Sequence, residues 1–434
     1  MPASAGRDAQ SEIYRDGVSG RRPAIPVAFP ALERAARRRL SRAAFAYVAG
    51  SAGLERTADA NTAAFGRHRI LPRVLRDVSA RDLGIELLGR RRPTPFVLAP
   101  IGVLDLAHPS GDVAAARAAA ALGVPAVLSN QASTPLEQVC RAMAEHTPDA
   151  SRWFQLYWSS SAELVASLVA RAERSGCEAV VVTLDTHLLG WRPRDLELGY
   201  LPFSHGRGIA QYTSDPVFQG LARERAAHAA GGPRTRPRIT PTALASFAGI
   251  LRRHPGRLRD NLRSGLPVAS VETFLDVFAN PALTWDDLAV LRELTTLPIV
   301  LKGVLHPDDA ARAVAAGVDA VWVSNHGGRQ LDGEQAALDA LPAVVAAVEG
   351  RVPVIFDSGV RSGADAVIAL ALGATAVAVG RPYVYALALA GERGVRELLR
   401  NLVAELDITL GLAGVRRVAD LDPSILVGGT RDGL

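Results

Sequence analysis

Short apolar segments recur along the chain, and each is bounded by Gly, Pro, Asn or Asp. Runs of this kind, rich in Val, Ile and Phe, are typical of strands that are buried on both faces of a parallel sheet. Amphipathic stretches of helix-forming residues separate most of these runs. Eight strands are predicted in this way, at 96–100, 125–130, 153–158, 179–185, 298–303, 320–325, 353–357 and 374–380.

The alternation of strands and helices predicts an α/β fold, namely a (β/α)8 TIM barrel, because strand–helix units in this number are what such a barrel requires. The barrel is expected to occupy residues 76–425. Residues 1–75 are predicted to form an N-terminal helical segment, with one helix at about 57–65. A helix is expected at 394–410 after the last strand, and residues 426–434 are predicted to be a frayed C-terminal tail.

One interval breaks the alternation. More than a hundred residues separate the fourth predicted strand from the fifth, far more than a crossover helix needs. Residues 202–285 are therefore predicted to be an insertion, partly flexible, whose middle at 221–264 shows little apolar periodicity. An insertion at the C-terminal end of a barrel strand lies over the barrel mouth, so we expect a lid. A surface excursion without a role is the alternative.

Composition and charge exclude several classes of protein. With 48% hydrophobic and 21% charged residues, the chain is not predominantly disordered. No apolar run reaches the roughly 20 residues that span a bilayer, and the N-terminus lacks the apolar stretch of a secretory signal. We therefore expect a cytoplasmic protein without a membrane partner. Basic residues are dense only at 222–263 and the net charge is +5, which is weak evidence for nucleic acid, so we expect no nucleic-acid partner.

Two residue types are informative because they are rare. The two cysteines, Cys140 and Cys177, can form neither a disulfide framework nor a metal-ligand spacing, so we predict no metal site. Lys302 is the only lysine among 49 basic residues. Arginine replaces lysine well on a solvated surface, but not where a compact ammonium group must reach one point. Lys302 is therefore a candidate functional residue.

Polar residues gather at the predicted strand ends. In a TIM barrel the loops that follow the strands meet at one mouth, and the chemistry takes place there. The candidates in chain order are Pro100, Ile101, Gly102, Ser129, Gln155, Tyr157, Thr183, Asp185, Lys302, Ser324, His326, Arg329, Asp357, Gly359, Arg361, Gly380 and Arg381.

The last two strand ends indicate a phosphate site. Each carries glycine beside an arginine, Arg361 or Arg381, and each is followed by a helix whose N-terminal N–H groups can bind an anion. Ser129, Gln155 and Thr183 can hydrogen-bond a flat heterocycle across the mouth. Lys302 can stabilise negative charge on a reduced ring. A phosphate-tailed, electron-accepting heterocycle of this kind indicates FMN as the cofactor.

The sixth strand end supplies a candidate base. His326 stands beside Gly-Gly and Arg329, and a histidine at such a strand end is more typical of a general base than of a structural residue. Asp185 can orient its imidazole and stabilise the protonated form. Arg329 and Arg192 can bind a substrate carboxylate, because the guanidinium fork matches that group.

Several sequence motifs, well separated along the chain, resemble those of a known protein family. They are SNHGGRQLD at 324–332, the segment 356–385, FQLY at 154–157 and TLD…GWRPRD at 183–195. From about residue 11 to 422 the chain resembles the FMN-dependent α-hydroxy-acid oxidase and dehydrogenase family. Within that family it most resembles the lactate 2-monooxygenases, on APIGV at 99–103, YVAGS at 47–51 and QYTSDPVFQ at 211–219.

The resemblance implies a role for each candidate. Tyr47, Arg192 and Arg329 would hold the substrate carboxylate, and Tyr157 its hydroxyl or carboxylate. His326 would be the base with Asp185 behind it, and Lys302 would lie near the N1 and O2 atoms of the flavin. The ring contacts implied are Pro100, Ile101, Gly102, Ser129, Gln155 and Thr183, and the phosphate contacts are Asp357, Gly359, Arg361, Gly380 and Arg381.

The sequence also departs from the family pattern. Gly102 stands where related oxidases usually have Ala. Gln131 occupies a pocket-wall position where relatives carry apolar or aromatic residues, which leaves the substrate side chain open. The insertion is longer than in the monooxygenases that the chain resembles.

The predicted reaction is L-lactate 2-monooxygenation, in which lactate and O2 give acetate, CO2 and water. The nearest alternatives are a 2-hydroxy-acid oxidase that releases the keto acid and hydrogen peroxide, and a dehydrogenase with another electron acceptor. Alternatives of another class are a non-redox barrel enzyme and a catalytically silent binding protein. The resemblance further implies a homo-oligomer, a tetramer or an octamer.

Overall fold

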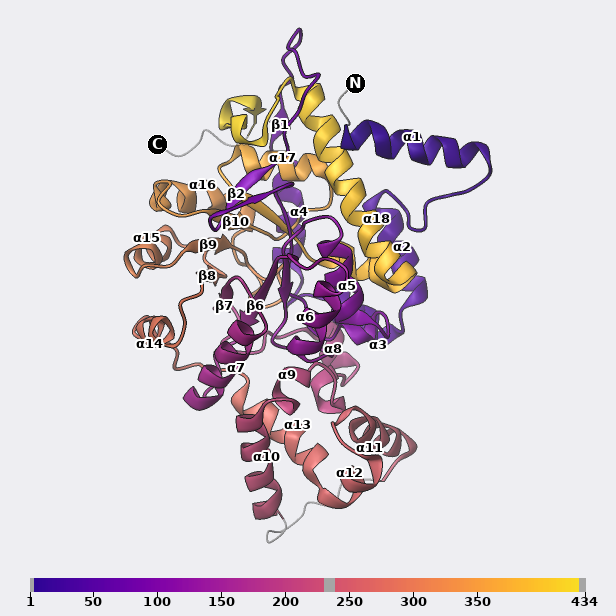
Figure 1. Ribbon diagram of the computed structural model, residues 1–434, viewed down its shortest axis with the longest axis vertical. Coiled ribbons are helices and arrows are strands. Elements are labelled where there is room, and N and C mark those ends of the chain that lie inside the picture. Colours follow the sequence, from indigo (N-terminus) through magenta and orange to yellow (C-terminus); the bar gives the residue numbers. More distant parts are fainter. Residues whose placement is uncertain (1–3, 230–238, 429–434) are drawn as a thin grey trace.

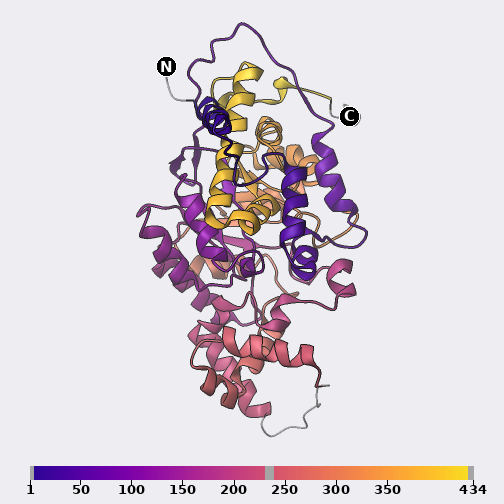
Figure 2. The ribbon, with the colours of Figure 1, turned by 90° about the vertical axis from the view of Figure 1, so that its right-hand side faces the viewer.

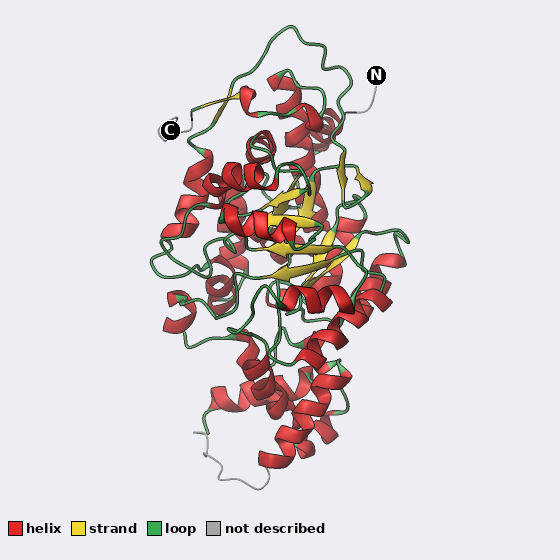
Figure 3. Cartoon of the chain, turned by 90° about the vertical axis from the view of Figure 1, so that its left-hand side faces the viewer, coloured by secondary structure: helices red, strands yellow, loops and turns green. Residues whose placement is uncertain are grey.

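The computed structural model describes residues 4–229 and 239–428. Its centre is a closed barrel of eight parallel strands surrounded by helices, so the chain adopts the predicted (β/α)8 TIM fold (Figures 1 and 3). The strands in chain order are β4 (Phe96–Leu98), β5 (Ala126–Leu128), β6 (Arg152–Leu156), β7 (Val180–Thr183), β8 (Ile299–Lys302), β9 (Ala320–Val323), β10 (Val354–Phe356) and β11 (Ala376–Val379).

The barrel closes where β11 pairs with β4, with Val377 opposite Phe96. Nearly every strand residue is buried, as expected for a parallel sheet covered by helices. The helices around it are α5 (Gly111–Ala120), α6 (Leu136–Ala144), α7 (Ala162–Arg174), α14 (Asp287–Leu294), α15 (Pro307–Ala315), α16 (Ala337–Val348), α17 (Gly363–Ala371) and α18 (Arg381–Ala413). Most strands are shorter than predicted, because the polar residues at their ends leave the ladder and turn into the mouth.

The N-terminal segment packs against the outside of the barrel. It contains α1 (Ala5–Val18), α2 (Phe29–Arg39), α3 (Arg42–Ala49), α4 (Arg56–Phe65) and the short strand β1 (Arg69–Ile70). β1 pairs with β12 (Leu426–Val427), so the first part of the predicted C-terminal tail is paired, while residues 429–434 lie outside the described chain. A hairpin of β2 (Ile85–Leu87) and β3 (Arg90–Arg92) precedes the barrel.

The insertion between β7 and β8 is largely helical in its described residues. It contains α8 (Pro193–Glu197), α9 (Ala210–Thr213), α10 (Pro216–Ala229), α11 (Pro241–Arg253), α12 (Leu258–Ser264) and α13 (Leu266–Val277). α8 packs against α3, whereas α10 to α13 extend away from the barrel (Figure 2). Little apolar periodicity was expected at 221–264, yet α10 and α11 form there. They form because their apolar faces pack against α13, with an aromatic cluster of Phe203, Tyr212, Phe218, Phe274 and Phe278.

Buried polar contacts fix the root of the insertion to the barrel. Arg171 of α7 donates from Nη1 to the Gln211 carbonyl (2.6 Å) and to Asp215 (3.2 Å), and from Nη2 to Ser214 (2.8 Å). Asp215 is fully buried and accepts the N–H groups of the first turn of α10. The buried ion pair of Arg171 and Asp215 therefore holds the root of the insertion against α7. None of the described helices is long and apolar enough to cross a membrane.

Candidate active site

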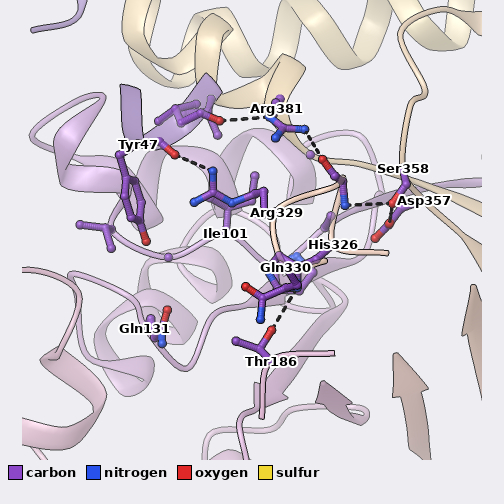
Figure 4. A pocket seen from close by; sticks show the side chains of 18 of the residues that line it. Tyr47, Ile101, Gln131, Thr186, His326, Arg329, Gln330, Asp357, Ser358 and Arg381 are labelled. Carbon is purple, nitrogen blue, oxygen red and sulfur yellow. Dashed lines mark hydrogen bonds between the residues drawn. The ribbon is translucent and has the colours of Figure 1, made fainter. Parts of the chain in front are cut away.

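The C-terminal strand ends enclose one cavity of about 1170 Å³, counted out to the solvent at its mouth. Figure 4 shows its lining residues converging from the barrel loops and from the N-terminal segment. The predicted site residues that line it are Tyr47, Pro100, Ile101, Gly102, Gln131, Tyr157, Arg192, Lys302, His326, Arg329, Asp357, Gly359, Arg361, Gly380 and Arg381. The structure thus brings most of the candidates to one place.

His326 and Asp185 form the expected pair. The Nδ1 atom of His326 lies 2.7 Å from Asp185 Oδ1, and Thr186 Oγ1 lies 3.2 Å from the same nitrogen. Burial lowers the pKa of His326, and Asp185 offsets this only in part. Burial raises the pKa of Asp185, but Lys302 and His326 more than offset it, so the carboxyl pKa lies below its usual range. The imidazole is therefore neutral at physiological pH, with Nε2 available as a base.

Lys302 lies buried between two carboxylates. Its Nζ atom is 3.6 Å from both Asp185 Oδ2 and Asp357 Oδ2, and it donates to Ser324 Oγ at 2.8 Å. Burial lowers the pKa of Lys302, but the two aspartates more than offset it, so its pKa is raised. The ammonium group is thus a fixed positive charge at the floor of the cavity.

Two arginines flank Tyr47 at the carboxylate end of the cavity. The guanidinium carbons of Arg192 and Arg329 lie 5.7 and 5.1 Å from the centre of the Tyr47 ring. Burial, together with the charge of Arg192, lowers the pKa of Arg329 to about 9. Asp195 Oδ2 lies 3.7 Å from Arg192 Nη1 and is the carboxylate that faces the two cations among the described residues. Two buried cations beside one acid leave positive charge that a further anion can balance, so this end suits the carboxylate of a substrate.

The opposite end suits a phosphate. Within the described residues, the Nε atom of Arg361 is buried without a hydrogen-bond partner. Burial lowers the pKa of Arg381 to about 10, with Arg361 contributing. A Cβ added at Gly380 would meet only Ile101, at 3.7 Å, so this glycine leaves open space at the N-terminus of α18. The orphaned donor, the paired cations and this helix terminus together fit the phosphate of FMN.

Arg381, predicted as a phosphate contact, is already hydrogen-bonded within the protein. Its guanidinium donates to the carbonyls of Val48 (3.1 Å), Gly50 (3.2 Å) and Gly327 (2.9 Å) and to Ser51 Oγ (2.8 Å). In this conformation the Arg381 side chain links the N-terminal segment to the His326 loop. It therefore contributes its positive charge to the anion site, while its N–H groups donate to the protein.

The predicted ring contacts at the ends of β5 to β7 form a buried chain of hydrogen bonds. Ser129 Oγ donates to Gln155 Oε1 at 2.8 Å, and Gln155 Nε2 donates to Thr183 Oγ1 at 3.0 Å. All three side chains are buried and none lines the cavity. Their donors and acceptors are therefore paired with one another in this conformation.

Sequence reasoning missed the apolar wall of the cavity. Phe203 and Phe278 line it from the insertion, together with Leu104 and Leu189 from the barrel loops. No motif marks these positions, and only the fold brings Phe278 to the mouth.

Gln131 lines the same cavity on a side different from His326 in Figure 4, and its side-chain amide has no hydrogen bond to the described residues.

No group of three or more His, Cys, Asp and Glu side chains within 4–229 and 239–428 is placed to hold a metal ion. The chemistry of the donors in the cavity is that of an anion and flavin site.

Comparisons with known proteins agree with this geometry. Residues 36–428 match the family model described as FMN-dependent dehydrogenase. An L-lactate oxidase of Lysinibacillus sphaericus is 40% identical over 408 residues, covering 93% of each chain. An FMN-dependent alpha-hydroxy acid dehydrogenase of Penicillium citrinum is 40% identical over 413 residues, covering 95% of this chain and 93% of the relative.

The structure of a mandelate oxidase with (S)-4-hydroxymandelic acid is similar as well. It is 37% identical, with a TM-score of 0.75 over 93% of this chain and 99% of that chain. None of these three names is that of a lactate 2-monooxygenase.

Proposed function

The chain belongs to the FMN-dependent dehydrogenase family, and from that premise we propose that it is an L-lactate 2-monooxygenase. At the coarser level it is an FMN-dependent oxidoreductase of 2-hydroxy acids. The observation that carries oxidation of a 2-hydroxy acid is that His326, paired with Asp185, lines the same cavity as the two arginines around Tyr47. One end of this cavity suits a carboxylate, and the other suits a phosphate.

FMN, when bound, supplies a two-electron acceptor. Arg192 and Arg329 bind the carboxylate of the hydroxy acid and orient its second carbon, because their two guanidinium groups flank Tyr47 and hold the anion between them. Nε2 of His326 takes the proton that the substrate loses. Asp185 stabilises the imidazolium that forms, since its carboxylate lies 2.7 Å from Nδ1.

Lys302 and Tyr157 complete the site. The Lys302 ammonium places positive charge where negative charge develops in the reaction. Burial raises the pKa of the Tyr157 hydroxyl, and Asp185 raises it further, so this group stays protonated and acts as a hydrogen-bond donor to the substrate oxygen. The products of the first stage are a 2-keto acid and two reducing equivalents.

The insertion is the feature that favours monooxygenation. Oxygen takes up the two electrons and gives hydrogen peroxide, which decarboxylates pyruvate to acetate, CO2 and water if both stay in the cavity. Phe203 and Phe278 form part of the cavity wall, and the Arg171 contacts keep the root of the insertion in place. A wall built in this way excludes water and slows the departure of pyruvate.

A simple oxidase is the second candidate, favoured by the L-lactate oxidase relative at 40% identity. It would release pyruvate and stoichiometric peroxide. The deciding experiment is aerobic turnover of L-lactate with and without catalase, with acetate, CO2, pyruvate and peroxide all quantified. Acetate that persists with catalase supports monooxygenation inside the cavity. Pyruvate as the main product with catalase present would replace the proposal by the oxidase.

A further inference from the structure

The loop that carries His326 has an unusual backbone. Three consecutive residues have positive φ: His326 at 57°, Gly327 at 67° and Gly328 at 76°. Glycine adopts this region freely, but histidine does so only when the surrounding structure holds it there. The position of the candidate base therefore depends on what fixes residues 324–328.

Ser324 Oγ accepts the N–H of His326 and Ser358 Oγ that of Gly327, both at 3.1 Å, and a pair of buried amides holds the loop from the other side. Asn61 Nδ2 donates to Asn325 Oδ1 and Asn325 Nδ2 donates to Asn61 Oδ1, both at 2.8 Å. Asn325 Oδ1 also accepts the N–H of Gly328 at 3.2 Å, and Asn325 Nδ2 also donates to the Gln335 carbonyl at 3.1 Å. Asn61 Oδ1 further accepts the N–H of Ala337 at 3.0 Å, at the start of α16. Both asparagines are at most 1% exposed.

Asn61 reaches the loop from the N-terminal segment. It lies on α4, which packs against both the His326 loop and the loop after β10. A Cβ added at Gly328 would come within 2.6 Å of the Ala58 nitrogen, and one added at Gly359 within 2.4 Å of the Asn61 carbonyl oxygen. The helix is therefore in backbone contact with the loop of the base and with the loop at the phosphate end.

We propose that Asn61 is a positioning residue for the reaction, which acts through Asn325 to hold His326 in its strained, reactive orientation. The inference rests on the proposed role of His326 as the base. The side chain of Asn61 does not line the cavity and makes no hydrogen bond to His326, so we expect it to act on the position of the imidazole.

Two substitutions separate positioning from mere packing. Asn61→Ala removes a donor and an acceptor, so Asn325 loses one partner on each side and the Ala337 N–H loses its acceptor. Asn61→Asp keeps the acceptor but places a carboxylate against the Asn325 carbonyl oxygen. Once protonated, that carboxyl donates to Asn325 Oδ1 as the amide does, so a low pH restores the pair.

The matched control is Asn261→Ala. Asn261 is another buried asparagine, whose Nδ2 donates to the carbonyls of Leu251 and His254 in the insertion, both at 3.0 Å. Its loss removes buried amide hydrogen bonds without touching the His326 loop. His326→Ala serves as the reference for loss of the base.

The experiment measures the anaerobic rate of flavin reduction by L-lactate, KM, and amide hydrogen exchange of the apoprotein. We expect Asn61→Ala to lower the rate by about ten- to a hundred-fold, with a smaller change in KM, and to speed exchange at Gly328 and Ala337. Asn61→Asp should regain rate relative to the wild type as the pH falls. Asp332, Glu334 and Asp339 on the neighbouring segments are present in both proteins, so the ratio of the two rates isolates the effect of the introduced carboxyl. Asn261→Ala should leave the rate unchanged.

A wild-type rate for Asn61→Ala, or equal losses in Asn61→Asp at every pH, would overturn the positioning role. If His326→Ala itself reduces flavin at the wild-type rate, the proposed base is wrong and the positioning role is overturned with it. Slow reduction in His326→Ala together with normal rates in both Asn61 variants would refute the positioning role alone.

Discussion

A methyl group added to Gly102 would lie 2.8 Å from both the Cβ atom and the carbonyl oxygen of Gln131. That carbonyl accepts the N–H of Val103 at 2.9 Å, and a Cβ added at Gly208 of the insertion would lie 2.9 Å from the same oxygen. The loops after β4 and β5 and the insertion therefore meet at a single peptide group in the wall of the cavity. The two glycines allow this close approach.

Replacing Gly102 by Ala tests this contact. The methyl has to displace Gln131 and, through it, Gly208, and overpacking of this kind destabilises by roughly 1–3 kcal/mol. We expect a lower Tm and a larger share of pyruvate and peroxide among the products, measured with catalase present. Gly220→Ala is the control, because a Cβ at Gly220 meets nothing within 4 Å. An unchanged product ratio in Gly102→Ala would show that the wall tolerates the methyl.

The pH dependence of flavin reduction tests the base. Burial lowers the pKa of His326 and Asp185 offsets this in part, so the neutral base persists below its ordinary pKa of about 6.5. The anaerobic rate should therefore fall only as the pH drops below that value. Asp185→Asn removes the offset, so the midpoint should move further down while the rate falls by about a hundred-fold or more.

Glu334 is the control for this titration. Burial and the charge of Asp185 together raise the pKa of Glu334 to about 7, so its carboxyl is a second group that titrates near neutral pH. Glu334→Gln should leave the midpoint of the acid limb in place. If the midpoint of the acid limb moves in Glu334→Gln and stays in place in Asp185→Asn, the limb reports the titration of Glu334 and not of His326. That result would reject our interpretation.

Lys302 should not tolerate the arginine that the rest of the chain prefers. Lys302→Arg keeps the charge but puts a larger planar group between Asp185 and Asp357, where the lysine is 3% exposed. We expect at least a ten-fold loss of FMN affinity, read from flavin fluorescence on titration of the apoprotein, a magnitude of about 1.4 kcal/mol. Arg292→Lys at the surface is the matched exchange and should have no effect. Normal flavin content in Lys302→Arg would contradict the assignment.

Arg171→Met tests the root of the insertion. Its loss leaves Asp215 buried without its charge partner, which costs about 3–5 kcal/mol. We expect a lower Tm and faster release of pyruvate, because the wall that carries Phe203 and Phe278 loses its anchor. Arg225→Met removes an exposed ion pair within the insertion and should change stability by about 1 kcal/mol at most. Equal product ratios in the two variants would show that the Arg171 contacts have no role in retaining pyruvate.

The barrel and the ring of polar residues at its mouth could be predicted from the sequence, because both follow from local patterns. Each strand is an apolar run, and candidates such as Lys302 and His326 lie at the end of one or within a few residues after it. The family resemblance added Tyr47, which the structure places beside the two arginines. The features that were predicted are those in which residues that are neighbours in the sequence also lie together in the structure.

The residues that were missed depend on contacts between distant segments. Asn61 is one buried polar residue in a short helix, and nothing in its neighbours indicates that it meets Asn325, 264 positions away. Phe278 follows α13, and its place at the mouth depends on how the insertion folds back. The helices of the insertion were obscured for the same reason, because their apolar residues face an aromatic cluster that only forms when α10 and α13 come together.

The contacts of the N-terminal segment bear on how the enzyme is made. The hydrogen-bond partner of the Asn61 side chain is Asn325, and that of the Tyr47 carbonyl is Arg329, which lies 282 positions later in the chain. A chain emerging from the ribosome therefore exposes α3 and α4 long before their partners are synthesised. A truncated product can contain every residue of the first five barrel strands and still have no working site. α4 therefore lacks its partners until β9 has been synthesised, and the site is complete only after β10 and β11 close the barrel and bring in Arg361 and Arg381.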